Sequence, residues 1–115
     1  MVYMIKVVND DKYKIGVSAR PNVNKRFAAI QSSCPYILSI YATCSGYVSE
    51  EAQIHLALKD YHLTGEWFQL PIHIANRLKR LFIENEIRGD SVQIAYKLFD
   101  AQPKTLDELL SEIPF

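Results

Sequence analysis

Glu51 and His55 are the residues whose types and spacing first suggest chemistry in this chain of 115 residues. They are four positions apart in a segment expected to be helical, and residues at i and i+4 share one face of a helix. The carboxylate and the imidazole can therefore converge on one point. A single carboxylate is a usual protein ligand of Mg²⁺, which keeps most of its waters and takes further ligands from a substrate phosphate. An ordinary surface pair on a helix has the same spacing, and both interpretations stay open.

Arg26 and Tyr3 could act near the same phosphate. Arg26 lies beside an apolar helical stripe, so it could lean over the edge of a sheet, where its planar fork and permanent charge suit a phosphate. Tyr3 and Tyr13 lie in two paired strands. A purely structural role, with the ring buried in the core and the hydroxyl at the edge of the core, accounts for both tyrosines. Because side chains alternate along a strand, Tyr13 and Lys14 point to opposite faces, so only one of them can face a given site.

The motif Gly65-Glu66-Trp67-Phe68 places a carboxylate between a turn glycine and two large aromatic residues. Glu66 and Trp67 are therefore candidates for supporting a site that holds a metal, a phosphate and an attacking water. The alternative is a turn that anchors the core while Glu66 points into solvent.

Apolar patterning predicts the strands that would position these residues. Two short apolar runs, at residues 2–5 and 13–17, flank the polar link Asn9-Asp10-Asp11-Lys12 and predict a β-hairpin. Residues 37–44 alternate between two faces and predict a third strand. The pattern therefore predicts three strands.

Helical periodicity follows in the intervening segments. Three helices are expected, at residues 22–31, at 49–64 after a Ser49 N-cap, and at 71–88 before a Gly89 stop. Residues 92–99 fit a strand or a helix. A capping box at residues 105–108 predicts a short tail helix over about residues 105–112.

Composition bounds the class of protein. Hydrophobic residues make up 49% and charged residues 23% of the chain, which are ordinary globular values for one domain. The absence of a run of about 18 apolar residues argues against a membrane partner. Cys34 and Cys44 lie outside any C-x-x-C spacing and are expected to be reduced thiols. The N-terminus shows no leader pattern, so we expect a cytoplasmic protein that is not secreted.

Charge is divided unevenly although the total is zero. Residues 1–48 carry a net +4 and residues 49–115 a net −4. A zero total excludes a simple polycation, but a basic half can form a local surface that faces anions. Chance segregation on solvated faces is the alternative.

Taken in order, five motifs resemble the GIY-YIG nuclease superfamily, most closely its phage and viral branch with Y-K-I-G and G-E-W-F motifs. These motifs are Val2-Tyr3, Tyr13-Lys14-Ile15-Gly16, Arg26, Glu51-x-x-x-His55 and Gly65-Glu66-Trp67-Phe68. The resemblance implies an α+β fold in which a small mixed sheet, here with three strands, is flanked by helices. It covers about residues 1–70, which predicts a nuclease domain there and a C-terminal extension over residues 71–115 that packs on it.

The resemblance also implies roles for single residues. Glu51 would hold one Mg²⁺ or Mn²⁺ ion, Arg26 would neutralise charge on the phosphate, and His55 would accompany the carboxylate. Lys14 stands where better-studied enzymes have a second tyrosine, so the general base is either Tyr3 or Lys14. Further contacts to nucleic acid are expected from three residues of the basic half, Lys12, Arg20 and Lys25.

Two functions from different classes follow. The first is a metal-dependent DNA endonuclease of phage or mobile-element type, for which DNA is the expected partner. The second is a catalytically weak or inactive module that keeps the fold and binds nucleic acid or inhibits a host protein. With either function, the C-terminal extension could bind a protein partner or form a homodimer.

Overall fold

The computed structural model of the protein describes residues 1–19 and 23–99. Arg20 and the predicted tail helix at residues 105–112 lie outside the described residues. The strands are β1 (Val2–Val7), β2 (Lys12–Val17), β3 (Leu38–Cys44), β4 (His62–Thr64) and β5 (Trp67–Gln69). The α-helices are α1 (Asn24–Ser32), α2 (Val48–Ala57), α3 (Ile72–Ile83) and α4 (Ser91–Leu98), with a short 3₁₀ helix η1 (Lys59–Tyr61) after α2.

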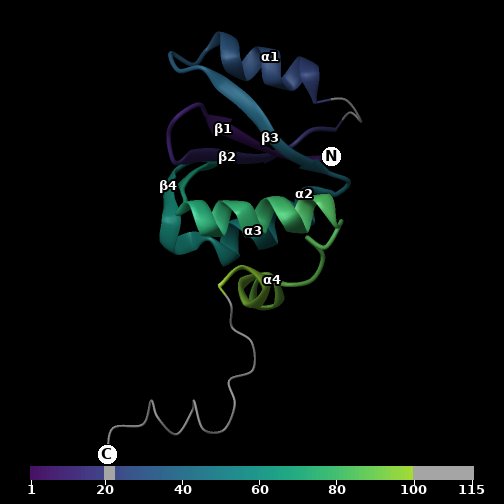
Figure 1. Ribbon diagram of the computed structural model, residues 1–115. Coiled ribbons are helices and arrows are strands. Elements are labelled where there is room, and N and C mark those ends of the chain that lie inside the picture. The colour runs from purple at the N-terminus through teal and green to yellow at the C-terminus, as the bar shows by residue number, and fades with distance from the viewer. Residues whose placement is uncertain (20–22, 100–115) are drawn as a thin grey trace, which may run out of the picture.

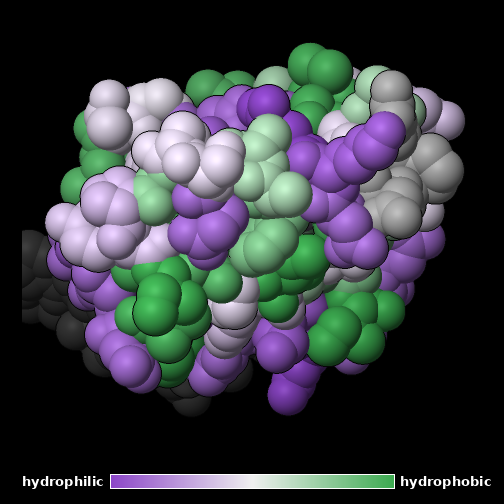
Figure 2. Space-filling model, turned by 90° about the horizontal axis from the view of Figure 1, so that it is seen from above, coloured by the Kyte–Doolittle hydropathy of each residue, from purple (hydrophilic) through white to green (hydrophobic). Residues whose placement is uncertain are grey.

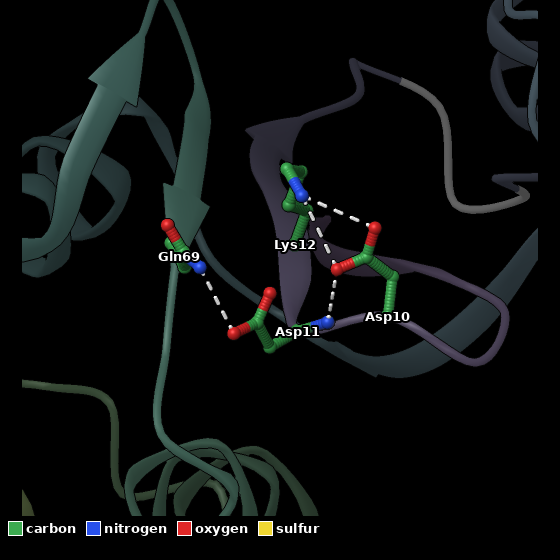
Figure 3. Close-up of polar contacts among 4 residues, drawn as sticks. All are labelled: Asp10, Asp11, Lys12 and Gln69. Carbon is green, nitrogen blue, oxygen red and sulfur yellow. Dashed lines mark hydrogen bonds and ion pairs between the residues drawn. The ribbon is translucent and has the colours of Figure 1, made fainter.

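A polar turn joins β1 to β2, as the sequence predicts. Asn9 adopts a left-handed conformation with φ of 62°, which asparagine tolerates better than most residues. The Asp10 carboxylate accepts a hydrogen bond from the Asp11 N–H (2.7 Å) and forms an ion pair with Lys12 (3.1 Å) (Figure 3). The Asp11 carboxylate accepts a hydrogen bond from Gln69 (3.0 Å), which ties the turn to the end of β5.

The predicted small three-stranded mixed sheet is wrong, although the fold is α+β. The sheet has five strands in the order β3-β1-β2-β5-β4, and every neighbouring pair is antiparallel. The two additional strands form a hairpin around Gly65, whose φ of +54° makes the turn. They have three residues each, too few for alternation to show in the sequence, and β5 extends the sheet by pairing with Lys12–Lys14 of β2.

The helix predicted over residues 49–64 is correspondingly shorter. It begins after Tyr47, not Ser49, and the side chain of Glu50 accepts a hydrogen bond from the Tyr47 N–H (2.9 Å). It ends at Ala57, and the chain then turns through η1 into β4.

The sheet lies between α1 on one face and α2, α3 and α4 on the other (Figure 1), and each face carries its own apolar core. On one face, Tyr3, Ile5 and Val7 pack beneath α1; we call this the α1-side core. On the other face, Tyr13 and Ile15 pack with residues of α2, α3 and α4 in the larger core. Lys14 therefore lies on the α1 face and Tyr13 on the opposite one.

α3 ends at Ile83 rather than near Arg88. Asn85 adopts a left-handed conformation (φ 56°), its N–H bonds the Phe82 carbonyl (3.1 Å), and the Glu86 N–H bonds the Leu81 carbonyl (2.8 Å). These bonds satisfy the last carbonyls of the helix and stop it. Gly89, also at positive φ (104°), lies in the loop before α4.

The ambiguous segment at residues 92–99 is helical. Asp90 caps α4 by accepting a hydrogen bond from the Gln93 N–H (2.9 Å), while the Gln93 side chain accepts one from the Asp90 N–H (3.0 Å). α3 and α4 bury residues in the same core as β1, β2 and α2. No described helix is long and apolar enough to cross a membrane.

Candidate functional site

The candidate site surrounds a short stretch of β2 where the neighbouring strand has ended. β5 pairs with β2 only from Lys12 to Lys14. At the next residue, the Ile15 N–H donates a hydrogen bond to the Glu66 carbonyl (3.0 Å) and the Ile15 carbonyl accepts one from His55 (2.8 Å). We call this stretch the open end of β2. Side chains reach it from both faces of the sheet.

Tyr3 and Arg26 approach the open end from the α1 face. Tyr3 lies opposite Gly16 in the β1–β2 register, is fully buried, and its hydroxyl accepts a hydrogen bond from Arg26 Nε at 3.4 Å. Arg26 itself is exposed on α1. A Cβ atom at Gly16 would overlap the Tyr3 hydroxyl and Glu66 Oε2, so the glycine allows the phenol and the carboxylate to meet over β2.

Lys14 and Glu66 form an ion pair on the same face. Lys14 Nζ lies 3.2 Å from Glu66 Oε2 and 5.7 Å from the centre of the Trp67 ring, and the Lys14 side chain is only 14% exposed. Glu66 Oε2 is buried and has no hydrogen bond of good geometry within the described part of the chain. The contact with Lys14 is therefore electrostatic, and the oxygen keeps capacity to accept a proton or a hydrogen bond.

Glu51 and His55 reach the open end from α2. The Nε2–H of His55 donates to the Ile15 carbonyl and lies 3.5 Å from Glu51 Oε1, so the imidazole links the carboxylate to β2. The His55 ring also packs edge-on against Phe68, with ring centres 4.9 Å apart. The i,i+4 pair is thus held in place, and the Glu51 side chain is 13% exposed.

Charged groups on the α1 face affect the pKa of Glu51 on α2. Burial raises the pKa of Glu51, the nearby Glu66 raises it further, and His55 and Lys14 oppose these effects. Burial also raises the pKa of Tyr3, whereas the hydrogen bond from Arg26 lowers it. At neutral pH Tyr3 is therefore a neutral phenol, and Glu51 is a carboxylate whose charge is poorly solvated.

A poorly solvated carboxylate suits a bound cation. Among the described residues, no group of three or more His, Cys, Asp or Glu side chains has the arrangement of a metal site. The described residues therefore lack the three or four protein ligands of a zinc site. Mg²⁺ needs fewer protein ligands, because one or two carboxylates hold it together with water and substrate phosphate. Glu51, with Glu66 nearby, fits that requirement.

Of the residues predicted to contact nucleic acid, the two that the structure describes, Lys12 and Lys25, lie outside this group. Lys12 is ion-paired with Asp10 at the turn end of β2, and Lys25 is exposed on α1. Sequence reasoning missed the Ile15 carbonyl, which orients His55, and gave no separate role to Gly16. A glycine inside a strand pattern is a signal of close approach, and it would have pointed to Gly16.

The family model described as the T5orf172 domain matches residues 1–83, which extend from β1 to the last residue of α3. This is a phage-associated domain that suggests a nuclease-like or DNA-binding module. None of the curated proteins or solved structures compared with the chain matches it significantly.

Proposed function

This chain belongs to the T5orf172 domain family, and on that premise we propose that it is a metal-dependent DNA endonuclease of the GIY-YIG type that hydrolyses phosphodiester bonds. The supporting observation is that residues from distant parts of the chain come together at one place in the fold. The chemistry-bearing residues of all five sequence motifs, Tyr3, Lys14, Arg26, Glu51, His55 and Glu66, surround the open end of β2. A phage or mobile-element origin and a place inside a host cell agree with this family.

Glu51 is the proposed ligand of a single Mg²⁺ or Mn²⁺ ion. A divalent cation held by Glu51 would supply positive charge for the phosphate oxygens and would favour ionisation of water at the site. His55 holds the carboxylate in position through the Ile15 carbonyl, and its Nε2–H stabilises the charged form of Glu51.

Arg26 and Tyr3 are the proposed phosphate-binding pair. Arg26 is exposed, and among the described residues no carboxylate forms an ion pair with it, so its charge is available to a phosphate. Tyr3 is a buried neutral phenol whose hydroxyl accepts a hydrogen bond from Arg26 Nε, so it orients the guanidinium toward that group. Donors fixed in advance where negative charge develops are the most effective form of electrostatic catalysis.

Lys14 is the proposed general base, the residue that accepts the proton of the attacking water. Of the two bases that the sequence suggests, Tyr3 is disfavoured by its raised pKa. Lys14 faces the same space, and as the cation of an ion pair it can take the proton of the water only after passing its own proton to the partly unsatisfied Glu66 oxygen beside it.

Lys14→Arg distinguishes proton transfer from simple positive charge. Arginine keeps the ion pair with Glu66 but does not lose its proton at accessible pH. We therefore expect cleavage by Lys14→Arg to fall at least about a hundredfold, as for removal of a general base, and Lys14→Met to fall equally. Measured rates over a pH series would test this. Recovery of most activity in Lys14→Arg would assign Lys14 to charge neutralisation instead.

The same geometry supports a second function, a module that binds nucleic acid or a host protein with little catalysis. The observation in its favour is that neither predicted base is free, because Tyr3 has a raised pKa and Lys14 is ion-paired. This protein would bind DNA equally with or without a divalent metal.

Cleavage of supercoiled plasmid separates the two functions. With purified protein and millimolar Mg²⁺ or Mn²⁺ we expect nicked and linear DNA, and with EDTA none, because Glu51 alone cannot activate the water. Binding measured on the same DNA serves as the control. Retained binding with no cleavage in either metal would contradict the endonuclease and favour the binding module.

A further inference from the structure

A cavity of about 500 Å³ opens beside the candidate site on the α1 face. Its apolar lining includes Val7, Ala29 and Ile30, and two aromatic residues, Trp67 of β5 and Tyr36 of the loop before β3, also line it. Lys14 and Arg26 line it as well, so it adjoins the proposed phosphate site. The α1 side of the molecule shows this mixture, with hydrophobic residues interspersed among hydrophilic ones (Figure 2).

The rim of this cavity is held by hydrogen bonds. The Gln31 side chain donates to the Tyr36 carbonyl (2.8 Å) and accepts from the Leu38 N–H (2.8 Å). The Val8 N–H donates to the Ile37 carbonyl (2.9 Å). These bonds fix the backbone from the Tyr36 carbonyl to Leu38, whereas the Tyr36 side chain is 61% exposed. A large aromatic ring on a fixed loop is prepared to stack on a flat ligand.

The charges around the cavity are not equivalent. Lys12, at the turn, is neutralised by Asp10 (Figure 3), and Lys14 is neutralised by Glu66. Arg26 forms no ion pair within residues 1–19 and 23–99. The lining of the cavity therefore combines apolar residues, two aromatic residues and one guanidinium without an ion pair among the described residues.

We propose that this cavity binds one unpaired nucleobase of the substrate strand, next to the phosphate held by Arg26. The inference rests on the endonuclease proposed above and specifies its substrate. A flat heteroaromatic ring suits the two aromatic residues, and its attached phosphate suits Arg26. The volume falls within the range of small-molecule sites and accommodates a single base. A base can enter such a cavity only when it is out of the duplex stack.

The base can come from single-stranded DNA or from a nucleotide flipped out of a duplex. In both cases the cost of unstacking is smallest where the base is already unpaired or mismatched. We therefore expect preference for single strands, and for duplexes that carry a mismatch or bulge at the bound position, over a fully paired duplex.

Trp67 provides a direct signal because it is the only tryptophan of the chain. Its fluorescence would be titrated in EDTA, without cleavage, with four DNAs of equal length: a single strand, the same strand with a central run of abasic nucleotides, a paired duplex, and a bulged duplex. We expect quenching by the single strand and the bulged duplex, and at least about tenfold weaker binding by the abasic strand. Equal affinity for intact and abasic strands would overturn the inference.

Tyr36→Ala tests the cavity by mutation. Loss of one stacking face is expected to weaken binding of the single strand about tenfold and to change duplex binding little. Tyr47→Ala is the matched control, because Tyr47 is similarly exposed (76%) and lies at the start of α2, away from the cavity. Equal affinities of both variants and the wild type would contradict a base in this cavity.

Thiol protection gives an independent readout. Cys34 lines the cavity and is half-buried, while Cys44 is buried in the larger core. Single-stranded DNA should slow alkylation of Cys34 by iodoacetamide, and Cys44 should react slowly throughout. If plasmid is cleaved in Mg²⁺ but Cys34 is not protected and Tyr36→Ala binds normally, this inference fails alone. If no DNA binds, the proposed endonuclease fails with it.

Discussion

Glu51→Gln is expected to lower metal-dependent DNA cleavage by about a thousandfold while the protein still folds and binds DNA. The substitution keeps the shape of the side chain and removes the charge that would hold the cation, and loss of that cation removes several kcal/mol of transition-state stabilisation. Initial rates of plasmid nicking in Mg²⁺ would measure the effect. Glu84→Gln is the control, because Glu84 is exposed at the end of α3. Cleavage by Glu51→Gln within tenfold of the wild type would contradict the assignment.

The same variant should be more stable than the wild type at neutral pH. The pKa of Glu51 is raised above its ordinary value of 4.5, so the folded protein binds this proton more tightly than the unfolded chain does. Stability from Glu51 is therefore full below about pH 4.5 and is lost as pH rises through the higher folded pKa. Urea unfolding should show a gain for Glu51→Gln at pH 7 that disappears under acidic conditions. A bound divalent cation should stabilise the wild type and not the variant.

Arg26→Lys is expected to lower cleavage about a hundredfold. Lysine keeps the positive charge but loses the planar fork and the fixed direction of the guanidinium N–H groups. Arg26 is exposed and its one described hydrogen bond, to Tyr3, is long at 3.4 Å, so the free energy of unfolding should change little. Rates at saturating DNA, with urea unfolding alongside, would separate catalysis from folding.

The control for Arg26→Lys is Arg80→Lys. Arg80 is exposed on α3, which covers the opposite face of the sheet, so this change should leave cleavage unaltered. An equal loss in both variants would indicate a general effect of surface charge. Full activity of Arg26→Lys would show that charge alone suffices at this position.

The sequence predicted the elements that carry strong periodicity and missed those that depend on tertiary pairing. The first hairpin and the third strand are long enough for two-residue alternation to appear. β4 and β5 have three residues each, and their pairing with β2 depends on contacts far apart in the chain. The end of α3 depends on the left-handed conformation of Asn85, which is less readily predicted than that of a glycine. Periodicity alone fitted residues 92–99 to a strand or a helix, and in the structure the capping pair Asp90 and Gln93 begins a helix there.

The site was predicted as a set of residue types, but their arrangement was not. Spacing placed Glu51 and His55 on one helix face, and alternation separated Tyr13 from Lys14. Neither argument could show that Glu66 lies beside Lys14, because that contact depends on the β2–β5 pairing absent from the predicted sheet. Nor could it show the raised pKa of Tyr3, which depends on complete burial beneath α1.

The open end of β2 has a consequence for the solubility of the protein. Unpaired backbone groups at a sheet edge invite strands from other molecules, and proteins usually block them. Here the outward N–H and carbonyl of Ile15 are already occupied by the Glu66 carbonyl and by His55. His55, which is proposed to support DNA cleavage, thus also helps to prevent edge-to-edge association at this point. Replacing this histidine should therefore favour aggregation whether or not the protein cuts DNA.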